Sequence, residues 1–244
     1  MKVLDGATFF GVRPSTDQDL SSETLLRLMD RNHVSEALTC SLQAIQYDAA
    51  AGNDQTLVLC QVHSQLHPVA VVDPRRWPDC LSEVERCASL GFVGFRLLRE
   101  FQGWAIATQS LRHLLRAIRD TGLPVTVHVP GAGDATALLE RVVSLDLDVI
   151  LAGVGYSTLA EALAVLIDAP RMSIEAHRLT CPGQVEVMVE QVGAERMIFG
   201  SWAPMHAQRP SIDMVLGAEI DERDKAAILG GNARRLFGLQ EGAQ

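Results

Sequence analysis

The chain has 244 residues, a length that suits one large domain or two small ones and is ample to bury a hydrophobic core. Its formal net charge of −9 leaves no basic stripe to neutralise phosphates, which argues against a nucleic acid partner. No apolar run approaches a membrane span or makes a signal peptide, so we expect a cytoplasmic protein without a membrane partner.

Short β-rich runs alternate with longer helical patterns along the whole chain. The helix candidates carry apolar residues at three- and four-residue spacing. We pair each strand candidate with the helix candidate that follows it. In chain order the pairs are 2–8 and 22–30, 36–40 and 54–65, 68–72 and 81–90, 93–98 and 110–121, 125–129 and 134–143, 148–152 and 158–168, and 172–176 and 184–192. The last strand candidate, 197–200, is followed by two helix candidates, 212–218 and 222–236.

Eight strands that each precede a helix predict an α/β fold of the (β/α)8 TIM-like barrel type, formed by residues 1–244 as a single domain. A doubly wound open sheet usually stops at fewer strands. In such a barrel the loops after the strands converge over the barrel axis, so we expect any site at the outgoing ends of the strands.

Polar residues interrupt two of the apolar strands. In the strand 172–176, alternation places Ser173, Glu175 and the following His177 on one face. His128 lies at the outgoing end of the strand 125–129. If the apolar face packs against helices, Glu175, His177 and His128 share the barrel interior, where they could transfer protons or simply satisfy one another.

Two further residues have open interpretations. Arg96 lies in an apolar strand, where its guanidinium could bind the carboxylate or phosphate of a ligand, or form an internal ion pair with Glu175. Trp104, in the long connection after that strand, could line a pocket or pack within its own loop. The five cysteines are odd in number and lack metal-binding spacing, which is typical of reduced thiols.

Several motifs together identify a family resemblance that spans nearly the whole chain. The most specific are RMIFGSWAP at 196–204 and ILGGNARRLFGL at 228–239, and weaker ones are VVDPR at 71–75, GFVGFRLL at 91–98 and PVTVHVPG at 124–131. The chain resembles the amidohydrolase-related barrels, the amidohydrolase 2 family of the metal-dependent hydrolases. The resemblance implies an amidohydrolase-type barrel with a metal centre at the strand ends.

The residues that the resemblance implies as metal ligands are mostly missing. The family carries a His-x-His pair on the first strand, one histidine each on the fifth and sixth, and an aspartate on the eighth. Here those positions hold Ala7, Phe9, His128, Gly153 and Trp202. One imidazole cannot retain a divalent cation, and no spacing supports a site rebuilt from Glu175 and the other histidines, so we expect no metal and no other cofactor.

Two functions stay open. One is metal-independent hydrolysis of a small anionic ester, lactone or amide; the other is a catalytically inactive family member that binds a small molecule or a partner. Relatives often form dimers, and nothing in the sequence decides for or against a homodimer. The expected catalytic residues are His128, His177 and Glu175, and the expected ligand-binding residues are Arg96, Trp202, Trp104, Phe9 and His206.

Overall fold

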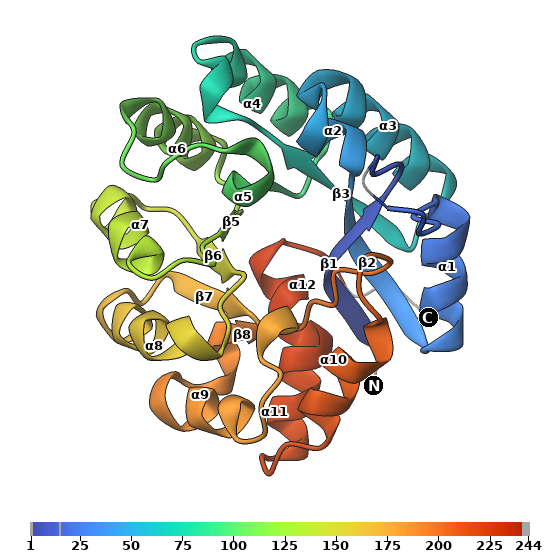
Figure 1. The fold of residues 1–244 in the computed structure, drawn as a ribbon, viewed down its shortest axis with the longest axis vertical. Coiled ribbons are helices and arrows are strands. Elements are labelled where there is room, and N and C mark those ends of the chain that lie inside the picture. Colours follow the sequence, from blue (N-terminus) through green and yellow to red (C-terminus); the bar gives the residue numbers. More distant parts are fainter. Residues whose placement is uncertain (1, 15, 241–244) are drawn as a thin grey trace.

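The computed structural model describes residues 2–14 and 16–240. Eight parallel strands follow one another in chain order, each paired with the next. Figure 1 shows the helices as an outer ring around them. The strands are β1 (Val3–Phe10), β2 (Val34–Ser41), β3 (Leu66–Val71), β4 (Gly94–Leu97), β5 (Val125–His128), β6 (Val149–Ala152), β7 (Met172–Glu175) and β8 (Met197–Ile198).

Helices cover the outside of this barrel and one of its ends. No helix in the described part of the chain is both long and apolar enough to traverse a bilayer. The helices are α1 (Ser22–Arg31), α2 (Leu42–Gln46), α3 (Ala49–Val62), α4 (Asp79–Ser89), α5 (Arg99–Gln102), α6 (Gln109–Thr121), α7 (Asp134–Val142), α8 (Leu159–Asp168), α9 (Gln184–Val192), α10 (Gln208–Leu216), α11 (Glu222–Ala226) and α12 (Asn232–Leu236).

The segment after β8 closes the barrel against β1. Gly6 N donates to Phe199 O at 2.9 Å, and Trp202 N donates to Ala7 O at 2.8 Å. Phe9 N in turn donates to Ala203 O at 2.9 Å. These backbone bonds fix Trp202 beside the outgoing half of β1, at the end of the barrel where the loops after the strands begin. We call this end the mouth.

The barrel interior is layered. Its floor is an apolar cluster sealed by Ala233 and Phe237 from the C-terminal helical region, and the mouth holds a second apolar cluster that includes Phe9 and Trp202. Between them lie buried polar side chains, whereas bulky apolar residues usually dominate the interior of such a barrel. These polar side chains are Arg96, Thr126, Ser173 and Glu175.

All eight strand segments and the barrel are confirmed, while the helices differ in places. The expected helix 222–236 is divided by a π-helical turn, Ala227–Gly231, in which the backbone of Gly230 departs from helical geometry, with φ 176° and ψ −34°. The helix expected from 54 begins at Ala49, where Asp48 caps it by accepting from Ala51 N. The short helices α2 and α5 were not expected.

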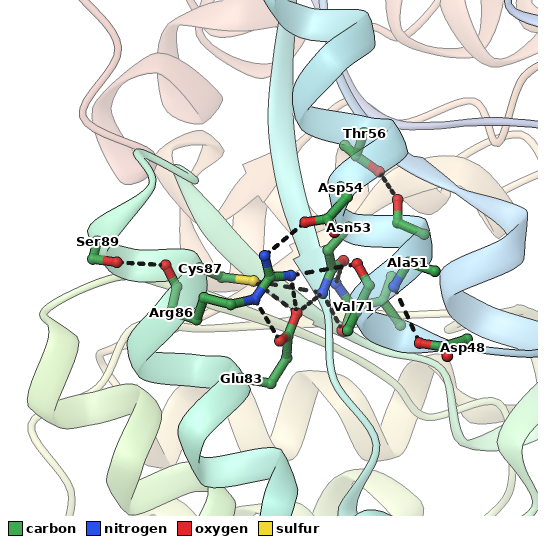
Figure 2. A network of polar contacts seen from close by, with 12 residues as sticks. Asp48, Ala51, Asn53, Asp54, Thr56, Val71, Glu83, Arg86, Cys87 and Ser89 are labelled. Carbon is green, nitrogen blue, oxygen red and sulfur yellow. Dashed lines mark hydrogen bonds and ion pairs between the residues drawn. The ribbon is translucent and has the colours of Figure 1, made fainter.

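A buried amide ties α3 to the barrel wall and to α4, as Figure 2 shows. Asn53 Nδ2 donates to Val71 O at 3.0 Å and to Glu83 Oε1 at 2.7 Å, and Asn53 Oδ1 accepts from Val71 N at 2.9 Å. Arg86 donates to the same Glu83 carboxylate and to Asp54. The network positions two outer helices on β3 and leaves the mouth to other residues.

Candidate functional site

A buried ion pair crosses the middle of the barrel. Arg96, from β4, donates through Nη2 to Glu175 Oε2 of β7 at 2.9 Å and to the Gly6 carbonyl oxygen at 2.8 Å. The Arg96 and Glu175 side chains are 3 % and 0 % exposed. Of the two interpretations of Arg96, the structure therefore shows the internal ion pair. Its other terminal nitrogen, Nη1, is buried without a protein hydrogen-bond partner.

The second oxygen of Glu175 faces the mouth. Glu175 Oε1 accepts from the Trp202 indole Nε1 at 2.6 Å and lies 2.9 Å from His177 Nδ1. Burial by itself would raise the pKa of the Glu175 carboxyl, but Arg96, His177 and Trp202 outweigh burial and hold this pKa at about 2. Glu175 is therefore a carboxylate at neutral pH.

The two imidazoles beside this carboxylate are buried and neutral. Burial and, to a smaller extent, the neighbouring His177 lower the pKa of His128 to about 3. Burial also lowers the pKa of His177, against the opposing effect of Glu175. His177 Nδ1 lies 2.9 Å from Glu175 Oε1, and His177 Nε2 is buried without a hydrogen-bond partner in the described part of the chain. The site thus holds free proton-accepting capacity.

The indole of Trp202 lies at the centre of this group. It stacks on the His177 ring with centroids 4.3 Å apart and meets the Phe9 ring edge-on at 5.2 Å. Its backbone is left-handed, with a φ of 62°, which costs a bulky residue about 1–3 kcal/mol. The stacking and the bond to Glu175 hold the indole despite this strain.

The structure gathers most of the predicted site residues around Trp202. His128 has its ring centroid 5.0 Å from the indole, and His206, exposed on the next loop, stacks at 6.1 Å. Trp104 lies elsewhere: its indole is buried in the core between barrel and helices and donates to Gln102 Oε1 at 2.8 Å. The Trp104 side chain belongs to the main apolar core and is 7 % exposed, so it does not reach the group around Trp202.

Two other neighbours of the site, Phe101 and Glu100 of α5, were not expected from the sequence. Phe101 lies 6.2 Å from Trp202 between ring centroids, and Arg13 places its guanidinium over Phe101. Glu100 Oε2 lies 3.4 Å from His128 Nδ1. A helix of four residues has no repeating pattern, and the only signal available was its position just after a predicted strand end.

A second buried carboxylate joins the closing segment to β1. Asp5 accepts from Ser201 N at 2.9 Å, from the Ser201 hydroxyl and from Gln208 Nε2 at 2.7 Å. Burial raises the pKa of Asp5 to about 6, although these bonds oppose it. The sequence signal for this buried carboxylate was an acidic residue within an apolar strand. Because all its partners are structural groups, Asp5 fixes the loop that carries Trp202 and takes no direct place in the site.

The residues at the mouth do not fit the family's metal centre. Ala7, Phe9 and Trp202 form part of one apolar cluster. A side chain at Gly153 would come within 2.4 Å of His128 Nε2, so the His128 ring takes up the space that a histidine at 153 would need. Within residues 2–14 and 16–240, no three His, Cys, Asp or Glu side chains are arranged to hold a metal ion.

A surface cavity of about 340 Å³ lies away from these residues, between the start of α3, the end of β3 and the start of α4. It combines acidic and basic side chains, among them Asp48, Asp73, Asp79 and Arg76. None of the predicted site residues lines it. Its mixed charges favour no particular ligand.

Comparisons with known proteins agree with the barrel. The profile of the family described as amidohydrolase matches residues 5–239. A search of curated proteins found no match. The fold is similar to 5-carboxyvanillate decarboxylase from Sphingomonas paucimobilis, with 16 % identity, 98 % of this chain and 99 % of that chain covered, and a TM-score of 0.78.

Two other solved structures share the fold. One is a probable 2-pyrone-4,6-dicarboxylic acid hydrolase from Acinetobacter baumannii with citric acid bound, at 18 % identity, 98 % and 100 % coverage and a TM-score of 0.76. The other is a dihydroxybenzoic acid decarboxylase from Polaromonas with bound manganese and the inhibitor 2-nitroresorcinol, at 16 % identity, 99 % and 98 % coverage and a TM-score of 0.76. At these identities the likeness extends to the fold alone.

Proposed function

Because this chain belongs to the amidohydrolase family, we propose that it is a hydrolase that cleaves a small anionic ester, lactone or amide without a bound metal ion. The donor set supports the metal-free part of the proposal. A divalent cation needs three or four donors, and the two Glu175 oxygens are already engaged by Arg96 and Trp202.

The observation that carries the proposal is the Glu175–His177 contact. A carboxylate 2.9 Å from one ring nitrogen can hold a neutral imidazole in position and stabilise its charged form after it accepts a proton. His177 Nε2 is buried and has no protein partner. His177 would therefore act as the general base that takes a proton from the attacking water.

His128 supplies a second neutral imidazole at a ring-centroid distance of 6.5 Å from His177. In the proposed reaction the water oxygen bonds to the carbonyl carbon while His177 takes the water proton. The bond to the leaving oxygen or nitrogen then breaks, and a histidinium returns the proton to the leaving atom. His128, whose ring centroid lies 5.0 Å from that of the same indole, would orient the carbonyl group.

An anionic substrate is supported by the unpaired cationic donors. Arg96 Nη1 has no partner inside the barrel, and Arg13 lies over Phe101 at the mouth. Two solved structures of the same fold hold citric acid or 2-nitroresorcinol, both acidic molecules. The class of ligand is therefore proposed as a small acid.

Trp202 favours a second candidate function. Its indole, stacked on His177 and bonded to Glu175, occupies the space between the proposed base and the mouth. A barrel with this arrangement could bind a small anion without turning it over. The two candidates differ in whether the bound molecule is hydrolysed.

A panel of carboxylated lactones and aryl esters, assayed in the presence of a chelator, separates the two. We expect chelator-insensitive hydrolysis that falls by about 10²–10⁴ in kcat/KM in His177→Gln, the usual contribution of general acid–base catalysis. His113→Gln, on α6 and exposed, is the matched control and should retain activity. Saturable binding without turnover would support the second candidate, and equal rates in His177→Gln and the native protein would refute the proposed base.

A further inference from the structure

The short helix α5 covers the buried rings of the mouth. Figure 1 shows α5 inside the ring of helices, beside β5. Glu100 approaches His128 and Phe101 approaches Trp202 from this helix. The His128 side chain is 2 % exposed, whereas that of Glu100 is 58 % exposed. Glu100 therefore lies on the solvent side of an imidazole that the proposed reaction needs to reach.

One ion pair holds this helix to a neighbouring loop. Arg99 Nη1 is paired with Asp134 Oδ2, and the two side chains are 28 % and 14 % exposed. Asp134 begins α7 and also accepts from Gly131 N at 2.8 Å, which anchors it in the loop after β5. The pair thus joins the segment after β4 to the segment after β5, the strand that carries His128.

The C-terminal side of α5 has the form of a joint. Gly103 is left-handed, with a φ of 73°, and no atom lies within 4 Å of the position that a side chain would take. The next residue, Trp104, is buried in the main core. A helix of four residues has no stability of its own. Gln102 is buried and accepts from Trp104 Nε1 at 2.8 Å, so it stays with Trp104, and the rest of the helix can move about Gln102 and Gly103.

We propose that residues 99–101 form a lid over His128 and Trp202, that the Arg99–Asp134 ion pair latches it closed, and that a ligand reaches His128 only after the lid opens about Gln102 and Gly103. A ligand has to reach His128 for the proposed hydrolysis, so the purpose of the lid rests on the proposed function. The lid itself is defined by burial and contacts, and its test needs no substrate.

Chemical modification of the histidines measures the opening directly. Diethyl pyrocarbonate reacts with neutral imidazoles, and mass spectrometry of peptides gives a separate rate for each histidine. His33 is exposed and far along the chain from the lid, so it serves as the internal reference. Since a buried group reacts through its open state, the His128 rate reports the opening equilibrium.

We expect His128 in the native protein to react at least about tenfold more slowly than His33. Asp134→Asn and Arg99→Gln each remove one partner of the Arg99–Asp134 ion pair. Each variant should raise the rate of His128 modification about fivefold, the effect of losing a partly exposed ion pair. Arg119→Gln, which removes the surface pair with Asp120, is the matched control and should leave the rate unchanged.

Two results would overturn the lid. One is a native His128 rate equal to that of His33, which would show an open mouth. The other is an unchanged His128 rate in both latch variants, with unchanged His33 rates showing that the fold is intact. Failure of the hydrolase assay with a confirmed lid would instead count against the proposed chemistry alone.

Discussion

Charge in the barrel interior is balanced by individual residues. The Arg96 guanidinium and the Glu175 carboxylate neutralise each other in a buried layer, and the two nearby imidazoles are neutral. A buried pair of this kind contributes little net stability, but removing one partner leaves an uncompensated charge. The residues of the site are therefore also residues on which folding depends.

Replacing Glu175 alone should destabilise the fold strongly. Glu175→Gln keeps the size of the side chain but leaves Arg96 buried without a counter-charge, which typically lowers the free energy of unfolding by about 3–5 kcal/mol. Urea unfolding measures this loss. The double variant Arg96→Met with Glu175→Gln should be less destabilised than the sum of the single changes.

Glu222→Gln is the control, because its ion pair with Lys225 lies at the surface with the Glu222 side chain 86 % exposed. It should change the free energy of unfolding by less than about 1 kcal/mol. A Glu175→Gln effect no larger than this control would contradict the buried pair.

The depressed pKa of His128 predicts a loss of stability in acid. The folded pKa is about 3, below the ordinary value of 6.5, so the unfolded chain binds a proton that the folded protein excludes. The stability from neutral His128 is present above pH 6.5 and is lost as the pH falls towards 3. Between pH 6 and 4.5 the free energy of unfolding should fall by about 1.4 kcal/mol per pH unit relative to His128→Gln.

The His128→Gln reference cancels the opposite slope of Asp5. The pKa of Asp5 is raised to about 6, so its contribution is present below pH 3.8 and is lost as the pH rises through 6. Urea unfolding of both proteins across this pH range gives the difference. Parallel pH profiles would mean that His128 is accessible to protons in the folded state.

At the scale of elements, the strands hold the site and the loops after them determine access to it. β4, β5 and β7 supply Arg96, His128 and Glu175, while α5 and the segment after β8 bring Phe101 and Trp202 over them. The outer helices are fixed separately, by polar groups such as Asn53 on α3. Changes in the outer ring should therefore affect stability more than the arrangement of the mouth.

Asn53→Ala tests how α3 is attached. The substitution leaves the buried N–H and C=O of Val71 without their side-chain partners, which should lower the free energy of unfolding by about 2–4 kcal/mol. Gln61→Ala on the exposed face of α3 should change it by less than about 0.5 kcal/mol. Equal effects of the two variants would show that the network in Figure 2 contributes nothing.

The sequence predicted the strands and the long helices better than the short helices. All eight strands and the helix 184–192 follow from apolar spacing, and the pairing of Arg96 with Glu175 was one of two alternatives that the residues left open. The helix α5 was missed because four residues carry no periodicity. The placement of Trp104 was decided by packing with distant residues, which a single sequence does not contain.

At the scale of the whole molecule, the family's barrel is retained while the mouth has different chemistry. The tail motif at 228–239 has a structural role: Asn232 donates to two backbone carbonyl groups, and Phe237 seals the barrel floor. The positions of the implied metal ligands instead form an aromatic and imidazole group around Trp202. The central claim of our proposal is that this chain keeps the fold of the family without its metal site.

Metal retention tests this claim most directly. The protein is incubated with Zn²⁺ or Mn²⁺, dialysed and analysed for bound metal, and its thermal midpoint is measured with metal and with chelator. We predict less than about 0.1 ion per chain and the same midpoint in both conditions, since too few donors are free. One ion retained per chain together with a raised midpoint would contradict the account.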